Sequence, residues 1–194
     1  MKTDVIVVSN KGDKLDAALA QVEKVAGYKN LSHKSALHLR LLAEEMLGMM
    51  NSVAGNVEGE FWIEDENDVY QLHLQVETDM DSEKRKQLIS ASTSGQNEAN
   101  RGIMGKIRAF FEPEDNFPVY FDSSLFPEDG MYETTSWSMS LYREQLELYL
   151  RQDRKGAQEA WDELEKSVVA HVADDVKVAI RGRTVEMTIV KKMA

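Results

Sequence analysis

Apolar residues near the N-terminus follow two helical patterns. Residues 14–26 carry apolar side chains three and four positions apart and are followed by Gly27, which predicts an amphipathic helix. A second helix is predicted from the N-cap Ser32 to about Met50. Its apolar stripe consists of Ala36, Leu39, Ala43, Met46, Leu47 and Met50. A short strand is predicted ahead of both helices, over residues 4–9.

Two hairpins are predicted further along the chain. Apolar residues 61–63 lead into a turn at 66–68, and apolar positions then alternate with polar ones over 70–77. This period of two predicts a half-buried strand with one face in water, and it places His73 on the wet face. Near the C-terminus, alternating segments at 176–180 and 185–189 flank the turn 181–183 and predict a second hairpin.

The middle of the chain has a different character. A short polar helix is predicted over about 82–90, then a polar loop to 101 and a helix over 102–111. Residues 112–136 contain all three prolines and no Lys or Arg, and we interpret them as an ordered or semi-ordered excursion whose aromatic residues need a packing partner. Two helices are predicted over 137–170, one of them carrying Trp161 and Val168.

The order of these elements predicts the fold class. Hairpins in the middle and at the end of the chain favour a mixed, mostly antiparallel sheet, and helices on one face make it an α+β, two-layer α/β sandwich. A repeating βαβ fold is not expected. The length of 194 residues predicts a single domain that spans 1–194.

Composition narrows the class of protein. The formal net charge of −11 disfavours binding to nucleic acid, because a phosphate backbone is repelled by most of such a surface. The absence of cysteine excludes disulfides, thiolate catalysis and cysteine-ligated metal sites. No segment approaches the roughly 20 apolar residues of a membrane span, so we expect no membrane association and a cytoplasmic location.

Two groups of residues are candidates for chemistry. Glu44 and Glu45 lie on a helix whose other face is apolar, where a carboxylate would act as a general base or simply keep the helix flank solvated. Gly102 and Gly105 open a helix, where unpaired N–H groups would bind an anion or where glycine would allow close packing. Both pairs of interpretations stay open. The four histidines are scattered, so no metal ligands are predicted.

Three segments together resemble a known family. They are residues 41–47 (LLAEEML), residues 100–107 (NRGIMGKI) and residues 182–187 (GRTVEM), separated by a hairpin and a polar loop. Their order resembles the GHKL (histidine-kinase-like) ATPases, with the anti-sigma-factor kinases as the nearest relatives. The resemblance covers about 4–111 and 172–191, so residues 112–170 are an expected insertion, and it implies a Bergerat-like ATP-binding fold.

The resemblance also implies a nucleotide site. Glu45 matches the family's water-positioning or basic glutamate, and Met49 stands where the family has an asparagine that holds Mg²⁺. A thioether is a soft ligand for a hard, oxygen-seeking ion, so ATP is the implied cofactor and Mg²⁺ binding is expected to be weak. The other positions matched to the family's adenine, phosphate and final-strand motifs are Asp79, Gly102, Gly105, Lys106 and Thr184.

These observations lead to competing hypotheses of function. The first is a regulatory or signalling nucleotide-binding domain with weak or absent catalysis; if active, it would be an ATP-dependent protein kinase or ATPase acting on a partner protein. The alternative is a pseudo-enzyme interaction module that binds no nucleotide and presents residues 112–170 to a basic regulatory partner. A metal-dependent hydrolase is a third hypothesis, which rests only on the abundance of acidic residues. A homodimer stays open as an assembly.

Overall fold

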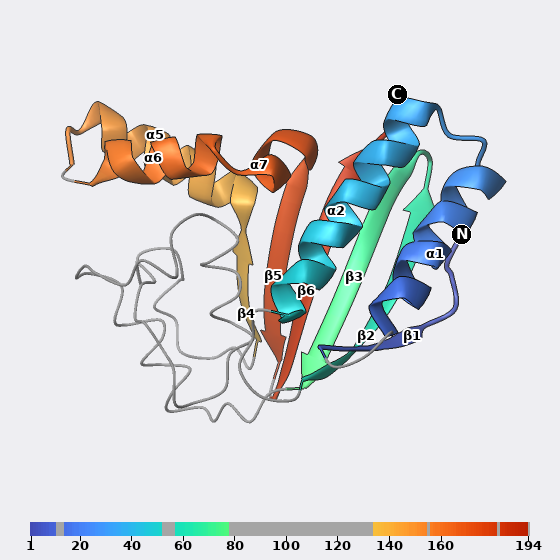
Figure 1. The fold of residues 1–194 in the computed structure, drawn as a ribbon. Coiled ribbons are helices and arrows are strands. Elements are labelled where there is room, and N and C mark those ends of the chain that lie inside the picture. The colour runs from blue at the N-terminus through green and yellow to red at the C-terminus, as the bar shows by residue number, and fades with distance from the viewer. Residues whose placement is uncertain (11–13, 52–56, 78–133, 155, 182, 194) are drawn as a thin grey trace.

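Among the residues that the computed structural model describes, six strands form one sheet, and the helices α1 and α2 lie over one of its faces (Figure 1). The structure describes residues 1–10, 14–51, 57–77, 134–154, 156–181 and 183–193. In chain order the elements are β1 (Ile6–Ser9), α1 (Lys14–Tyr28), α2 (His33–Asn51), β2 (Glu58–Glu66), β3 (Val69–Glu77), β4 (Thr134–Ser138), α5 (Met139–Arg151), α6 (Ala157–Glu165), α7 (Val168–Val172), β5 (Asp175–Arg181) and β6 (Thr184–Lys192).

The strands are ordered β1-β2-β3-β6-β5-β4, and every neighbouring pair is antiparallel. The two hairpins, β2–β3 and β5–β6, are joined because β6 pairs with β3 along nine residues of each strand. This arrangement confirms the predicted α+β, two-layer sandwich. The sheet of the described residues is antiparallel throughout, so no mixed pairing is seen among them.

The first hairpin turns where the sequence predicts it. Asn67 and Asp68 have φ values of 48° and 60°, and a two-residue loop with positive φ at both positions matches the twist of the strands that it joins. Asn and Asp tolerate this left-handed conformation better than most residues. The alternation over residues 70–77 therefore reports a real strand, β3.

The two N-terminal helices also follow the predicted pattern. Ser32 caps α2, since its hydroxyl oxygen accepts a hydrogen bond of 3.1 Å from the Ser35 backbone N–H. Arg40 on α2 forms ion pairs with Glu44, at 2.8 Å on the same helix, and with Glu23 on α1. The Arg40–Glu23 ion pair therefore links α1 to the flank of α2 that carries Arg40.

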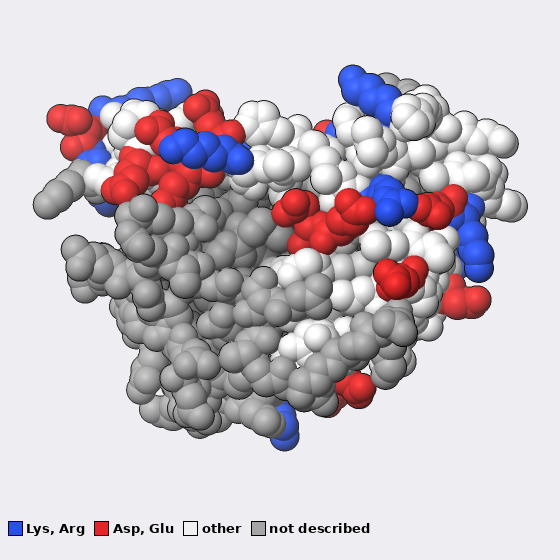
Figure 2. Space-filling model, in the orientation of Figure 1, with Lys and Arg blue, Asp and Glu red and all other residues white. Residues whose placement is uncertain are grey.

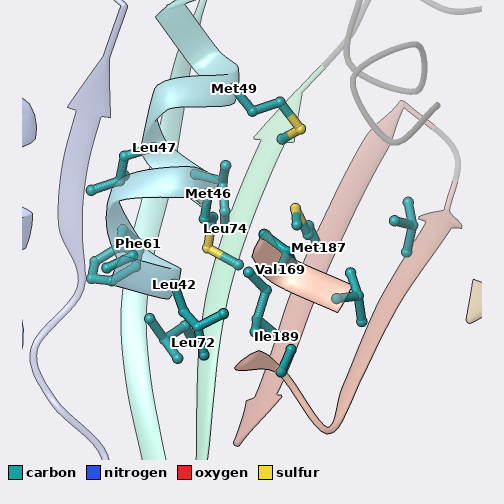
Figure 3. Packing of buried hydrophobic residues seen from close by; sticks show 14 of the residues in the cluster. Leu42, Met46, Leu47, Met49, Phe61, Leu72, Leu74, Val169, Met187 and Ile189 are labelled. Carbon is teal, nitrogen blue, oxygen red and sulfur yellow. The ribbon is translucent and has the colours of Figure 1, made fainter. Parts of the chain in front are cut away.

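Between the helices and the sheet lies one continuous apolar core (Figure 3). From α2 come Leu39, Leu42, Met46, Leu47 and Met50, all with 2% exposure or less. The sheet contributes the alternate positions of β2, β3, β5 and β6 that point toward the helices. Gly59 is required where β2 and β3 approach closely, because a Cβ there would lie 2.7 Å from the backbone oxygen of Gln75.

The secondary structure of residues 134–172, which precede β5, differs from the predicted one. Residues 134–136 were predicted to belong to the excursion, but they begin β4, which pairs with β5 at the edge of the sheet. The two helices predicted over 137–170 are three helices in the structure: α5, α6 and α7. Ser138 and Ser167 cap the N-termini of α5 and α7, because each side chain accepts a hydrogen bond from a backbone N–H in the first turn. Trp137, Leu146 and Val169 belong to the same core cluster as α2. The elements predicted over 82–111 lie outside the described residues.

Candidate functional site

The flank of α2 away from α1 carries two of the predicted site residues. Glu45 is half-buried and Met49, one helical turn later, is 5% exposed. Glu45 lies five positions after Arg40, or about 140° around the helix. Since Arg40 marks the flank joined to α1, Glu45 and Met49 occupy the flank that α1 leaves uncovered. In Figure 3, Met49 lies in the layer between α2 and the sheet with Met46 and Met187.

The two adjacent glutamates of α2 have different roles. Glu44 is exposed and is held by Arg40, with 2.8 Å between Oε1 and the guanidinium Nε. Glu45 forms no hydrogen bond or ion pair with any described residue. Its carboxylate therefore keeps its full acceptor capacity toward a ligand or a water molecule. Of the pair, Glu44 is a solvated helix-flank residue and Glu45 is the one available for chemistry.

One end of the sandwich gathers the remaining elements of the predicted site. Across four strands, Thr134, Arg181, Thr184 and Glu77 form a row of successive Cα partners. The C-terminal end of α2 reaches the same end of the sheet (Figure 1). The end of β3, the start of β6 and the end of α2 are thus neighbours in space, although more than a hundred residues separate β3 from β6.

Thr184 points away from the α2 flank. Val185, Met187 and Ile189 on β6 are fully buried under the helices, and alternate residues of a strand point to opposite faces. The side chain of Thr184 accordingly belongs to the outer face, opposite to Glu45 and Met49. The described residues bring Glu45 and Met49 together but not Thr184.

The other predicted site residues are Asp79, Gly102, Gly105 and Lys106, and all four lie outside the described residues. The residues that flank this part of the chain, Glu77 and Thr134, are both in the row at the α2 end of the sheet. Among the described residues, no three His, Asp or Glu side chains are grouped closely enough to hold a metal ion. No helix in the described ranges has both the length and the apolar composition needed to cross a membrane.

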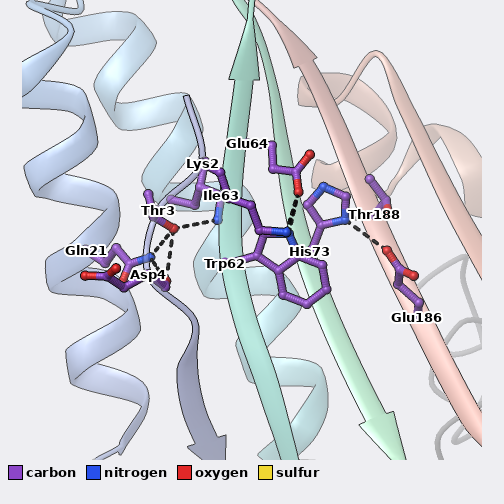
Figure 4. A network of polar contacts seen from close by, with 10 residues as sticks. All are labelled: Lys2, Thr3, Asp4, Gln21, Trp62, Ile63, Glu64, His73, Glu186 and Thr188. Atoms are coloured by element: carbon purple, nitrogen blue, oxygen red, sulfur yellow. Dashed lines mark hydrogen bonds and ion pairs between the residues drawn. The ribbon is translucent and has the colours of Figure 1, made fainter.

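A polar and aromatic cluster on the outer face was missed by the sequence analysis (Figure 4). The rings of Trp62 on β2 and His73 on β3 are stacked, with centroids 4.7 Å apart and an interplanar angle of 1°. Trp62 Nε1–H donates to Glu64 Oε1 at 3.0 Å, and the Lys2 ammonium lies 4.9 Å from the Trp62 ring centroid. Because of this stack His73 is only 7% exposed, so its predicted place on a wet face is wrong.

The two ring nitrogens of His73 are in different surroundings. Nδ1 lies 3.0 Å from Glu186 Oε1 and 3.2 Å from Thr188 Oγ1, both on β6. Nε2 is buried and has no hydrogen-bond partner. The Glu186 carboxylate and the Thr188 hydroxyl therefore both contact Nδ1, and no described group forms a hydrogen bond with Nε2.

A nearly buried ion pair lies at the opposite end of the sheet, beside the β2–β3 turn. Asp65 has a 3% exposed side chain and pairs at 2.5 Å with Lys29, the residue directly after the end of α1. The contact with the Asp65 carboxylate raises the pKa of Lys29. Burial raises the pKa of the Tyr70 hydroxyl, and the negative charge of Asp65 adds to that effect. The pair anchors the end of α1 to the sheet, far along β2 and β3 from Glu77.

Comparison with known proteins assigns no family. No family model matches the chain, and no curated protein matches it. The GHKL resemblance therefore stays a prediction that rests on the residues quoted above.

Proposed function

We propose that this chain is a regulatory nucleotide-binding domain of the GHKL type, with ATP or ADP bound beside the flank of α2 that faces away from α1. The observation that carries the proposal is the half-buried Glu45 carboxylate, which no described residue engages, one turn before Met49. A second observation supports the proposal: the end of α2, the end of β3 and the start of β6 lie near one another. Motifs of the GHKL family were matched to these parts of the chain. A nucleotide ligand favours a cytoplasmic location, where ATP is abundant.

The proposed site binds nucleotide without a requirement for Mg²⁺. The side chain expected to hold the ion is replaced by the buried thioether of Met49. Mg²⁺ demands oxygen ligands in near-ideal octahedral geometry and gains little from a thioether. Glu45 would still orient a water molecule or accept its proton, but without a bound cation the charge that develops on the phosphates is poorly stabilised. We therefore propose weak or absent hydrolysis and a regulatory role for nucleotide binding.

The experiment is a calorimetric titration of the whole chain with ATP and with ADP, in EDTA and again in excess Mg²⁺. The proposal expects saturable binding whose Kd is the same within about twofold in the two conditions. Met49→Asn restores the amide oxygen, so in this variant Mg²⁺ should tighten ATP binding by about tenfold. Met50→Asn is the matched control, since Met50 is also buried but lies about 100° away around the helix. Absence of binding in all conditions would refute the proposal.

A second candidate function is a protein-interaction module without nucleotide. It is favoured by the surface of α5, where Leu141 and Leu148 are 61% and 53% exposed and, seven positions apart, share one helix face. The exposed Glu144 and Glu147 flank these leucines, and acidic side chains gather over α5 and α6 in Figure 2, with basic ones among them. Such a surface suits a helix with an apolar stripe bordered by Lys or Arg.

The two candidates are separated by one further titration. A synthetic amphipathic helix with a leucine stripe bordered by lysines should bind the wild-type chain and lose affinity for Leu148→Glu. Binding of this helix together with failure to bind ATP or ADP would favour the interaction module. Nucleotide binding that Leu148→Glu leaves unchanged would favour the first function.

A further inference from the structure

The edge of the sheet at β1 borders a groove. The groove has a volume of about 520 Å³. One wall is the N-terminal segment, with Thr3, Asp4 and Ile6, and the other is the face of α1 that carries Gln21 and Lys24. Figure 4 shows Gln21 reaching from α1 to Thr3 and Asp4. The side-chain amide of Gln21 donates to the Asp4 carbonyl oxygen at 2.8 Å and also to Thr3 Oγ1. These bonds hold the segment against α1, so the groove exists before any ligand arrives.

Beyond this contact the strand edge is open. β1 is the terminal strand of the sheet and pairs only with β2 among the described strands. The Asn10 N–H donates to the Val57 carbonyl at 3.2 Å, which continues the register of the β1–β2 pairing. In an antiparallel pair, only every second residue of a strand forms backbone hydrogen bonds to the neighbouring strand. Ile6 and Val8 therefore bond to β2, whereas the N–H and C=O of Val7 point away from the sheet. An exposed edge of this kind is a template for another strand.

Apolar side chains are concentrated at the same edge. Eight large apolar residues of the described ranges are exposed, and four of them are Met1, Val5, Val7 and Tyr28. Val5 and Val7 are 48% and 49% exposed, and Val7 lies on the outer face beside Glu60. Met1 and Tyr28 line the groove on the other side. A strand added to β1 would thus find apolar contacts for side chains on both of its faces.

The charges of the groove indicate which strand fits. Lys24 lines it and forms no ion pair with any described residue, while Lys2 is paired with Glu64 at 2.9 Å. Asp4 is the one acidic side chain in the lining. A lysine without a partner is notable in a chain with a net charge of −11. It favours an occupant that brings a carboxylate to the groove.

We propose that an extended peptide with alternating apolar and acidic side chains adds to β1 as a new edge strand. Its backbone pairs with the outward N–H and C=O of Val7, its apolar side chains pack beside Val5 and Val7, and its acidic side chains enter the groove toward Lys24. This mode of recognition takes its affinity from main-chain hydrogen bonds and its specificity from alternate side chains. The proposal is independent of nucleotide binding, since α1 lies between β1 and α2 and the proposed nucleotide site is on the flank of α2 that faces away from α1.

The test uses the whole chain and a fluorescein-labelled peptide, Ser-Val-Glu-Val-Glu-Val-Ser, capped at both ends, with binding followed by fluorescence anisotropy. Val7→Pro removes the outward N–H without breaking a bond to β2, because proline is tolerated at such edge positions. It should weaken binding by at least about tenfold. Val7→Ala is the matched control and keeps the N–H. Lys24→Glu should weaken binding by about tenfold, and the peptide with Lys in place of Glu should bind more weakly than the original.

Each outcome decides the proposal. If Val7→Pro fails to fold, a peptide N-methylated at alternate amides tests the same hydrogen bonds on the wild-type chain and should not bind. No binding of the acidic peptide to the wild-type chain would overturn the proposal, as would equal binding to Val7→Pro and Val7→Ala. A dimer of this chain that sedimentation detects and Val7→Pro dissolves, without peptide binding, would assign the edge to a second copy and also overturn it.

Discussion

Trp62 and His73 lie face to face on neighbouring strands, with ring centroids 4.7 Å apart and planes within 1° of parallel. They are direct cross-strand partners on the outer face of the sheet. Such a pair joins β2 to β3, and the contact of His73 with Glu186 extends the connection to β6. The stack therefore ties three strands together on the face that α1 and α2 do not cover.

Replacement of His73 should reveal how much the stack contributes. His73→Ala removes the stack and the Nδ1 contact, and we expect it to lower the free energy of unfolding by about 1–3 kcal/mol. His73→Phe should cost less, because it keeps the ring and places carbon where the buried Nε2 has no partner. Gln71→Ala on the same strand face is the control, with an expected change within about 0.5 kcal/mol. Urea unfolding measures all three, and equal effects of Ala and Phe at position 73 would contradict the account.

Glu64 should make stability depend on acid pH. The hydrogen bond from Lys2, followed by that from Trp62, lowers the pKa of Glu64 below its ordinary value of 4.5. A carboxyl whose pKa is lower in the folded state contributes stability above its unfolded pKa and loses it as the pH falls through the folded pKa. Glu64→Gln should therefore destabilise the protein at pH 7 and have a smaller effect below about pH 4. Urea unfolding midpoints of the wild-type chain and Glu64→Gln, measured between about pH 4 and pH 7, test this prediction. A difference in midpoint that does not change with pH would contradict it.

The ion pair of Lys29 and Asp65 should stabilise the fold at neutral pH. Lys29→Met leaves the nearly inaccessible carboxylate of Asp65 without that partner, so we expect a lower unfolding temperature. Lys24→Met is the matched control, because Lys24 lies five positions earlier, on α1, and has no ion pair with any described residue. The raised pKa of Lys29 means that its contribution is present at pH 7 and is lost only as the pH rises through that pKa, above 10.5. An equal effect of the two substitutions would show that the pair adds nothing.

Two glycines should respond in opposite directions to the same substitution. Gly48 is an exposed helical residue with open space around its Cα, so Gly48→Ala should raise the free energy of unfolding by about 0.5–1 kcal/mol. Gly59→Ala would bring a Cβ within 2.7 Å of the Gln75 backbone oxygen and should lower that free energy by about 1–3 kcal/mol. Chemical unfolding of both variants provides the comparison. A stable Gly59→Ala protein would mean that β2 and β3 are less closely apposed than described.

Local patterns were sufficient to predict most of the described elements. The alternation over residues 70–77 and the turn residues Asn67 and Asp68 define the β2–β3 hairpin, because strand period and turn chemistry are local properties. β4 was missed because five residues that run directly into α5 show too short an alternation. Its strand conformation depends on pairing with β5, a contact that the sequence does not display. The insertion of β6 between β3 and β5 is equally non-local.

The candidate site was predictable only in part, for a similar reason. The spacing of Glu45 and Met49 on one helix flank follows from helical geometry alone. The separate roles of Glu44 and Glu45 do not, because they depend on the bridge of Arg40 to α1. The place of Thr184 on the outer face was predictable, because the apolar alternation of Val185, Met187 and Ile189 assigns residue 184 to the opposite face of the strand. The stack that buries His73 needs a tryptophan from the neighbouring strand.

Thermal unfolding of the wild-type chain with ATP, with ADP and without ligand, each in EDTA and in Mg²⁺, is the decisive test of nucleotide binding that needs no Mg²⁺. A ligand at about 100 times its Kd stabilises the native state by roughly 2.7 kcal/mol. For a chain of this size that corresponds to a rise in Tm of about 5–10 °C. The account predicts this rise with nucleotide in EDTA and no further rise with Mg²⁺. An unchanged Tm at millimolar nucleotide would contradict it, and a rise seen only with Mg²⁺ would contradict the role assigned to Met49.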